Sequence, residues 1–313
     1  MNRGSIYDRI AALTITLGAP VFRMIGTKPG VFPRYIRQAD KLGVHFRTTH
    51  YYDPVYAESD LPADTTGERE LPGIDFHAND QLALLKEFAF QDELLQFADD
   101  YPQGLKFGHK NEYFDYCDAE SLYCMLRHFK PQRLIEIGSG FSTMVASAAL
   151  GRNAKDGAQC RHICIEPYER DWIAGLGVEV IRERVQDVDP ELFATLRSGD
   201  FLFIDSTHVI RPFGDVLTEY QRIIPSLPSG VMIHVHDIFT PHDYPEEWLR
   251  QDRRLWNEQY LLEAMLAHSS RYRVRLALNW LKHHHGDDLG RAFPTLIRHP
   301  EHEPRSFWFE ISR

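Results

Sequence analysis

Short apolar runs alternate with helix-like segments after Pro131, and this alternation constrains the fold more than any other feature of the chain. Five such runs have the length and composition of strands buried on both faces: 134–137, 162–165, 178–181, 201–204 and 231–235. The segments between the first five have helical character: 143–150, 171–176, 190–196 and 215–224. Two later runs, 271–277 and 306–311, are expected to complete a sheet. The pattern predicts an α/β fold, with a mainly parallel sheet and helices on both of its faces.

The N-terminal third has a different texture. Residues 28–80 are rich in Pro, Gly, Asp and Tyr and show no sustained hydrophobic period, which indicates an irregular segment. Helical spacing returns at Asp80 and again over 118–129. A chain of 313 residues has room for one large α/β domain and an appendage. We therefore expect an N-terminal helical and irregular arm or cap over 1–104 and a ligand-binding domain over 105–313.

An apolar stretch from Ile10 to Ile25 raises the question of a signal peptide or a membrane span. It is shorter than the roughly 20 residues that a span needs, and it contains Pro20 and Arg23. Large apolar residues recur at helical spacing in this stretch and just before it: Ile6, Ile10, Leu13 and Leu17. This spacing favours an amphipathic helix packed on the protein over contact with a membrane surface. We expect no transmembrane segment and a cytoplasmic location.

The charge balance argues against a nucleic-acid partner. The chain has 35 basic and 45 acidic residues, a net charge of −10, and no long run of Lys or Arg. A small-molecule substrate is therefore expected, and the sequence leaves homo-oligomer formation open. The four cysteines lack the paired spacing of zinc sites and are expected to be reduced thiols, mostly in the core: Cys117, Cys124, Cys160 and Cys164.

The segment 133–143 is the strongest local signal. It predicts a strand, a tight turn with glycines at Gly138 and Gly140, and the start of a helix, so that the backbone can approach a ligand closely. A dinucleotide-binding turn would normally have a third glycine where Thr143 stands. Glu136, two residues before the turn, is a carboxylate that can hold the ammonium of an amino-acid moiety. S-adenosylmethionine has that group and NAD has none, so the turn favours S-adenosylmethionine.

Two further acids follow the next strands. Glu166 closes the second strand, where a carboxylate can accept hydrogen bonds from both hydroxyls of a ribose. Both nucleotide families use this arrangement. Asp187 follows the third strand, from where it can reach an adenine, although an ordinary solvated loop explains it equally well.

These motifs resemble class I S-adenosylmethionine-dependent methyltransferases, in particular the branch called methyltransferase type 24, over roughly residues 105–240. Other segments resemble a bacterial subgroup similar to enzymes of saccharide and natural-product tailoring: 116–143, 204–209, 234–239, 244–248 and 256–260. The resemblance implies a Rossmann-like sheet and methyl transfer, and it leaves the acceptor open. The residues expected to contact the cofactor are Glu136, Gly138, Ser139, Gly140, Ser142, Glu166, Asp187 and Asp205.

Acids and imidazoles gather at the ends of the fourth and fifth strands. Asp205 follows the fourth strand with His208 three residues later, and the fifth strand ends in His234, His236 and Asp237. Alternation along the strand places His234 and His236 on one face. His234 is expected to be a buried core residue. The residues expected to act in catalysis are His208, His236, Asp237 and Asp205.

Two chemistries fit this group. In the first, His208 or His236 is a general base that takes the proton of an acceptor hydroxyl without a metal. In the second, Asp205, His236 and Asp237 bind a divalent metal that acidifies the acceptor oxygen, as related O-methyltransferases do with carboxylates at these strand ends. A His stands before Asp237 where an acid would be expected, so the metal-independent base is favoured.

The segments after the fifth strand bear on the acceptor. Aromatic, amide and acidic residues that suit a sugar or polyol follow it, although a helix core explains them as well: Trp248, Trp256, Asn257, Glu258 and Tyr260. The run 283–288, with three consecutive histidines, is expected to be a solvated loop rather than a metal tract.

The leading hypothesis is O-methylation of a small hydroxylated acceptor, such as a saccharide unit or a natural product, with N-methylation left open. One alternative is a metal-dependent oxygenase, which requires a complete shell of Asp205, His236 and Asp237. Another is a non-catalytic cofactor-binding protein whose N-terminal arm fills the acceptor cavity.

Overall fold

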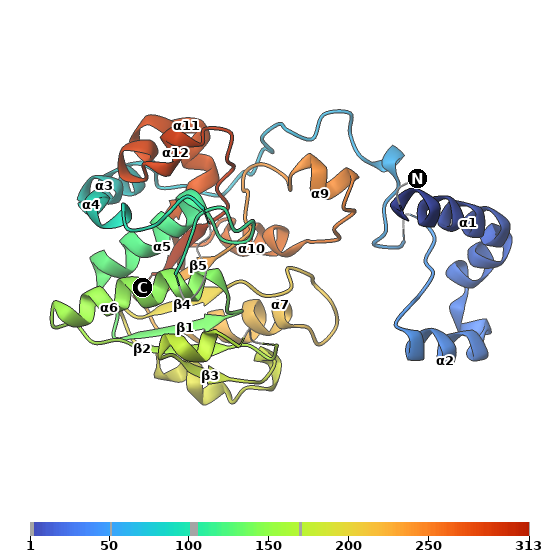
Figure 1. Ribbon diagram of the computed structural model, residues 1–313, viewed down its shortest axis with the longest axis horizontal. Helices are drawn as coiled ribbons and strands as arrows, with labels where there is room; N and C mark the ends of the chain where they lie inside the picture. The colour runs from blue at the N-terminus through green and yellow to red at the C-terminus, as the bar shows by residue number, and fades with distance from the viewer. Residues whose placement is uncertain (1–2, 51, 101–105, 169–170, 313) are drawn as a thin grey trace. The chain divides into compact units, whose positions relative to one another are not determined.

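The chain folds into two compact units. The computed structural model describes residues 3–50, 52–100, 106–168 and 171–312 (Figure 1). The first unit comprises Met1–Thr65 and Glu246–Leu255, and the second comprises Thr66–Pro245 and Trp256–Arg313. The boundary expected at 104/105 lies outside the described residues, and it does not coincide with this division. Residues 78–94 were expected in the arm, but they belong to the second unit because they supply core side chains such as Leu84 and Leu85.

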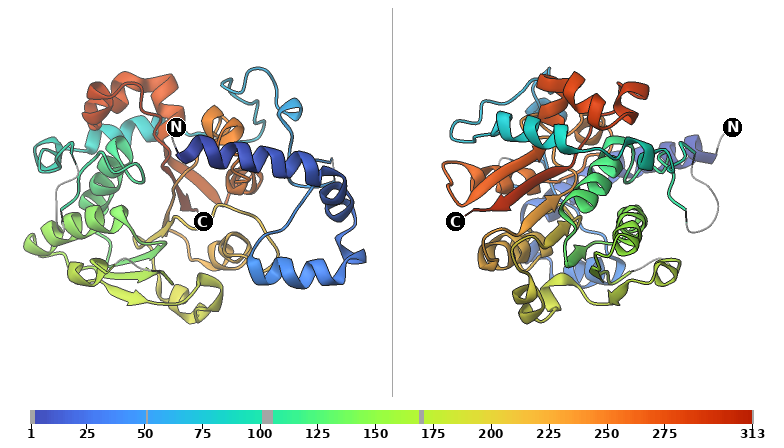
Figure 2. Two further views of the ribbon diagram at one scale, coloured as in Figure 1. Left: turned by 45° about the vertical axis from the view of Figure 1, so that its right-hand side comes forward. Right: turned by 90° about the vertical axis from the view of Figure 1, so that its left-hand side faces the viewer.

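The second unit is built on one seven-stranded sheet, and this confirms the predicted α/β fold. The strands are β1 Arg133–Ile137, β2 Arg161–Ile165, β3 Glu179–Ile181, β4 Phe201–Ile204, β5 Met232–Val235, β6 Tyr272–Ala277 and β7 Phe307–Ile311. Their order is β3-β2-β1-β4-β5-β7-β6. The first five run parallel, while β7 pairs antiparallel with both β5 and β6, which can be followed as orange and red strands in Figure 2.

Helices cover both faces because alternate strand residues point to opposite sides. Leu134, Phe201 and Phe203 face one core, which also holds buried residues of α3 Ala78–Glu87, α5 Tyr116–Phe129, α6 Phe141–Lys155 and α11 Leu278–Ala292. Ile135, Leu202 and Ile204 face the other core, with η5 Pro190–Thr195, α7 Asp215–Thr218, α8 Ile224–Ser226 and α10 Glu258–Leu266. Burial on both faces explains why the strands are apolar without a polar alternation.

Some predicted helices have a different form. The segments 171–176 and 190–196 are short 3-10 turns, η3 Ile173–Leu176 and η5. The helix over 215–226 is interrupted by a π-helical turn, η6 Glu219–Ile223. The expectation of a loop at 283–288 holds only at a kink, since these residues lie within α11 and only His285 departs from helical geometry, with φ −143° and ψ 40°. Leu281 and Leu289, before and after the kink, are fully buried and hold both parts of the helix in the core.

The first unit contains α1 Arg3–Thr27, α2 Pro33–Leu42 and α9 Glu246–Arg250. The phenyl rings of Phe22 and Phe46 stack with centroids 4.1 Å apart. The Tyr56 hydroxyl donates to the carbonyl of Leu249 at 2.9 Å, and Arg250 pairs with Glu58. These contacts join the irregular segment to α1 and α9.

One expectation for the first helix is wrong. The apolar stretch is longer than Ile10–Ile25, since Ile6–Thr27 is a helical stretch of 22 residues that is apolar and long enough to cross a membrane, with Pro20 and Arg23 inside α1. Its apolar stripe is exposed within the described part of the first unit. Ile10, Leu13 and Leu17 are 55%, 59% and 74% exposed.

The strands of the second unit end in register, and this places the residues after them in a row. Ile137 pairs with Ile165 on one side and with Ile204 on the other, and Ile204 pairs with Val235. The residues that follow these strands therefore lie side by side in the order Glu166, Gly138, Asp205 and His236. The chain order reverses between β1 and β4, and ligands of open α/β sheets bind at such a reversal.

Gly138 and Asp205 meet at that reversal. The φ angle of Gly138 is +80°, and a Cβ atom there would lie 1.9 Å from the carbonyl oxygen of Asp205. Only glycine fits both the conformation and the space. The amide of Asp205 in turn donates to the carbonyl of Ile137 at 2.9 Å.

We predict that Gly138→Ala lowers the free energy of unfolding by about 3 kcal/mol, at the upper end of ordinary single substitutions, because a methyl group must displace backbone. Urea unfolding measures the change. Gly151→Ala is the control, since it lies in α6 with no atom within 4 Å of an added Cβ, and its effect is expected to be neutral or slightly stabilising. Equal stability of the two variants would contradict the tight junction between β1 and β4.

Candidate functional site

A cavity opens at the carboxyl ends of β1 and β4. It is lined by the glycine turn, two acids and two aromatic residues that precede α5: Tyr113, Phe114, Gly138, Ser139, Gly140, Phe141, Ser142, Glu166 and Asp205. Six of the eight residues expected to bind the cofactor are in this group. The structure brings neither Glu136 nor Asp187 to the cavity wall. Tyr113 and Phe114 were missed, because no local motif marks an aromatic residue that lies beside a distant turn.

The glycine turn presents backbone to the cavity. Gly140 has open space where a Cβ would lie, so a side chain there would project without displacing the protein. The amide of Gly140 donates to the Thr143 hydroxyl at 3.0 Å. Thr143, which stands where a dinucleotide site would have a third glycine, thus holds the turn against the start of α6.

Glu136 supports this turn from behind. Its side chain is on the α6 side of the sheet and 1% of it is exposed. Ser142 and Thr143 donate their hydroxyls to Oε1 at 2.5 and 3.0 Å, and Oε2 lies 2.7 Å from Nε2 of His162. The predicted contact between Glu136 and an ammonium group does not fit this placement, because strand alternation turns the carboxylate toward α6. Its hydrogen bonds fix the helix start instead.

Glu166 lies at the end of β2 and faces the cavity. Its Oε2 accepts from the amide of Ser139 at 3.2 Å, and its Oε1 accepts from the amide of Tyr168 at 2.8 Å. These two hydrogen bonds orient the carboxylate. Each oxygen retains a lone pair for a further donor, which suits the two hydroxyls of a ribose.

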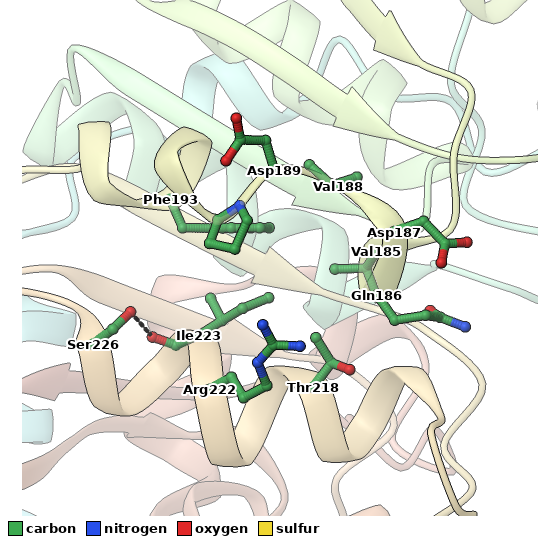
Figure 3. A pocket seen from close by; sticks show the side chains of 11 residues that line it. Val185, Gln186, Asp187, Val188, Asp189, Phe193, Thr218, Arg222, Ile223 and Ser226 are labelled. Carbon is green, nitrogen blue, oxygen red and sulfur yellow. Dashed lines mark hydrogen bonds between the residues drawn. The ribbon is translucent and has the colours of Figure 1, made fainter.

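Asp187 lines a separate cavity of about 370 Å³, which lies between η4 Val185–Asp187 with η5 and the helical segment 215–226. Figure 3 shows Arg222 reaching from the helix into the space below the turn that carries Gln186. Asp187 pairs with Arg184 at 2.7 Å and is half-exposed. Its contact with an adenine stays a prediction.

His208 is the centre of a buried charged cluster beside the glycine turn. Its Nε2 lies 3.3 Å from Oδ1 of Asp205 and 3.4 Å from Oδ2 of Asp237. One ligand atom from each of these three residues lies within 4.8 Å of the others. His208 and Asp237 have φ angles of +61° and +59°. Such conformations are costly for residues other than glycine, and they are concentrated at functional sites.

Glu258 holds the other nitrogen of this imidazole. The Nδ1 atom of His208 lies 2.8 Å from Oε2 of Glu258, whose side chain is fully buried at the start of α10. Trp256 packs on the imidazole with ring centroids 4.3 Å apart. The ring orientation is thereby fixed, with Nε2 directed at Asp205 and Asp237. This carboxylate–imidazole pair was missed because its members are fifty residues apart in sequence and α10 carries no motif.

The other two histidines lie behind this cluster. His236 is buried under Phe114, and its Nδ1 is 3.6 Å from Oδ1 of Asp205. His234 stacks on Trp308 at 3.9 Å in the core, as expected for it. The metal shell predicted from Asp205, His236 and Asp237 is not the group that the structure brings together, since His208 lies closer to both carboxylates than His236 does.

The charges of the cluster set its protonation. Burial alone would lower the pKa of His208, but Asp205, Glu258 and Asp237 raise it well above its ordinary value. Burial would raise the pKa of Asp205, and the two imidazoles lower it well below its usual range. Arg305 adds a further cation, with Nε 3.1 Å from Oδ1 of Asp237. Asp205 is thus an anion at neutral pH that faces the cavity.

Comparison with known proteins matches the central part of the chain. Residues 135–238 match the family described as Methyltransferase domain, a range that begins in β1 and ends just after Asp237. This part of the chain therefore resembles a methyltransferase domain. The seven-stranded sheet with its reversed β7 fits that fold, and the match includes the glycine turn, Glu166, Asp205 and His208 of the methyltransferase domain.

Individual relatives are more distant. An uncharacterized protein of Archaeoglobus fulgidus is 28% identical over 172 residues, which cover 51% of this chain and 77% of that protein. An O-methyltransferase from Bacillus cereus in complex with SAH is 13% identical, with a TM-score of 0.38 over 76% of this chain and 98% of that one. The plantazolicin methyltransferase BpumL, also with SAH, is 13% identical, with a TM-score of 0.35 over 63% and 84%.

We predict that Glu136→Gln lowers the stability of the second unit by about 1–3 kcal/mol, since the NH₂ of Gln replaces one carboxylate oxygen and cannot accept the hydrogen bonds made to it. The affinity for S-adenosylmethionine should change little. Urea unfolding and titration calorimetry separate the two effects, with the exposed Glu183→Gln as control. A large loss of affinity at unchanged stability would instead restore a direct contact with the ammonium group.

Proposed function

We propose that this chain transfers the methyl group of S-adenosylmethionine to an oxygen of a small hydroxylated acceptor. The observation that carries the proposal is the oriented imidazole of His208 beside the glycine turn. Glu258 holds its Nδ1, and its Nε2 is directed at Asp205 on the cavity wall. A methyl acceptor that bears a proton needs such a base near the point of transfer.

The cavity suits this cofactor. Glycine backbone at 138 and 140 allows close approach, and Glu166 offers two oriented oxygens for the ribose. The ionised carboxylate of Asp205 suits a neighbouring positive charge. When bound, the cofactor supplies a methyl group on a positively charged sulfur, and the protein positions the acceptor for in-line attack.

In the proposed reaction His208 takes the proton of the acceptor hydroxyl at Nε2. The resulting imidazolium is stabilised by Glu258 at Nδ1 and by Asp205 and Asp237 at the other nitrogen. Glu258 therefore positions the ring and raises its basicity without touching the acceptor. Phe114 packs against His236 and separates it from the acceptor in the proposed reaction, so His236 acts only on Asp205, whose negative charge it stabilises.

The closeness of Asp205, His208 and Asp237 also favours a second candidate, in which a divalent metal binds these three residues and acidifies the acceptor oxygen. The residues present fit such an ion, since carboxylate and imidazole are its common ligands. Metal analysis of the purified chain and the effect of a chelator on turnover separate the two candidates. A stoichiometric metal whose removal abolishes transfer would replace the base mechanism.

The acceptor is proposed to be a saccharide or a natural product. Trp256 beside His208 and Asn257, whose Oδ1 accepts from the amide of Ile210 at 2.6 Å, are next to the proposed base. An aromatic ring with polar neighbours suits a polyhydroxylated molecule. The net charge of −10 argues against a nucleic-acid acceptor.

Gly140→Leu tests the cofactor site. Gly140 lines the cavity and an added Cβ there meets no protein atom within 4 Å, so we expect the variant to fold and to lose S-adenosylmethionine binding. Gly151→Leu in α6 is the matched control, because it too has open space around the added Cβ. Titration calorimetry measures the affinity of both variants for S-adenosylmethionine. Unchanged affinity in Gly140→Leu would refute the cofactor assignment.

His208→Gln and Glu258→Gln test the base. Transfer from tritiated S-adenosylmethionine to nucleotide sugars and hydroxylated metabolites first identifies an acceptor. We then expect His208→Gln to lower kcat by about 10²–10⁴ while cofactor affinity is retained, with the exposed His45→Gln as control. The base must be neutral, so the rate should rise with pH through a pKa above the ordinary 6.5.

Glu258→Gln removes a carboxylate that raises the pKa of His208, so this limb should move to lower pH and the plateau should fall. A merely structural role for Glu258 would lower the rate without moving the limb. A kcat of His208→Gln equal to that of the control would show that His208 is not the base.

A further inference from the structure

An exposed apolar stripe runs along α1 in the first unit. Its members recur every three or four residues and so share one face of the helix: Ile6, Ile10, Leu13, Leu17, Val21 and Met24. They are between 44% and 74% exposed. A stripe of this length is far more than the scattered apolar residues of an ordinary soluble surface.

The C-terminal end of the helix has partners on another face. Phe22 stacks on Phe46, Ile25 is buried, and a Cβ at Gly26 would lie 3.1 Å from Thr48. These contacts hold α1 to the irregular segment 46–48 at its C-terminal end and use a different face. The stripe is therefore not a core surface of the unit to which α1 belongs.

The length of the apolar part of α1 matches the thickness of a lipid bilayer. The apolar stretch Ile6–Thr27 has 22 residues. At 1.5 Å per residue it is about 33 Å long, and the hydrocarbon layer of a bilayer is about 30 Å thick. The 13 residues from Ile10 to Phe22 include no charged side chain.

Basic residues follow the stripe directly. Lys28, Arg34, Arg37 and Lys41 are all exposed and lie on or next to α2. Asp40 is the single acid among residues 28–46. The segment 28–46 therefore has a positive net charge, although the whole chain has a net charge of −10. A basic segment beside an apolar helix is attracted to anionic lipid headgroups.

We propose that α1 attaches this chain to an anionic phospholipid bilayer, with the stripe in the hydrocarbon and the basic residues of 28–41 at the headgroups. A soluble partner with an apolar groove would match the stripe but not the basic segment that follows it. The methyltransferase site lies in the other unit, so attachment does not depend on the proposed reaction.

Flotation of the full-length chain with vesicles tests the proposal. Vesicles of phosphatidylcholine with a minority of phosphatidylglycerol should carry the protein to the top of the gradient, and pure phosphatidylcholine should carry less of it. Higher salt should reduce the difference between the two. Leu13→Asp with Leu17→Asp should weaken binding by about tenfold or more, since each Asp has a high cost in hydrocarbon.

The control makes the same change in charge elsewhere on the surface. Leu95→Asp with Ile297→Asp alters two residues of the second unit that are 78% and 68% exposed, and it should float like the unaltered chain. Calorimetry with S-adenosylmethionine on every variant shows whether the domain is intact, so failure of attachment is distinguished from failure of the proposed function.

Any one of four results would overturn the proposal. The unaltered chain stays at the bottom of the gradient with both vesicle types. The control variant loses flotation as fully as the stripe variant does. The third result is that N-terminal sequencing finds the chain purified from cells to begin after Thr27, which would make α1 a cleaved signal. A dimer that forms without vesicles, fails to float and dissociates in the stripe variant would assign the stripe to a second copy instead.

Discussion

The close approach of Gly138 to the backbone of Asp205 is the constraint on which the site depends. It joins the ends of β1 and β4 where the strand order reverses, and it leaves no space for a side chain between them. Glu136 and Thr143 hold the turn from the helix side, while the hydrogen bond from Asp205 to Ile137 holds it from the strand side. Because strand register is continuous from β2 to β5, this one junction positions Glu166, Asp205 and His236 together.

Electrostatics organises the other half of the site. His208 lies among Asp205, Asp237 and Glu258, and Arg305 neutralises part of the resulting negative charge. Burying several charges is costly unless they are paired. Here each carboxylate has a cation within reach, so the cluster is stable as a unit. Removing one member would leave the others unpaired, which is why conservative amide substitutions are more informative here than truncation to alanine.

The sequence was most informative where short-range physics decides the structure. Strand positions followed from apolar runs, and β4 was predicted residue for residue, because burial on both faces imposes a short continuous apolar run. The same alternation places Glu136 on the α6 side of the sheet, where Ser142 and Thr143 donate to it, while its contact with an ammonium group stays a prediction. The pairing of His208 with Glu258 was out of reach, because it is made by tertiary packing of α10. The length of the apolar stretch was underestimated because it was counted from Ile10 to Ile25, whereas the apolar part of α1 runs from Ile6 to Thr27.

One consequence concerns the release of the spent cofactor. Contacts at the glycine turn and at Glu166 do not touch a transferable methyl group, so they would hold the molecule equally well before and after the reaction. Asp205 differs, because its carboxylate stays ionised on the cavity wall. In the proposed reaction the bound sulfur loses its positive charge as the methyl group leaves, and the attraction to this anion ends at that moment. In the proposed reaction, the carboxylate of Asp205 thus favours binding of the positively charged cofactor over binding of its uncharged product, and this difference promotes product release.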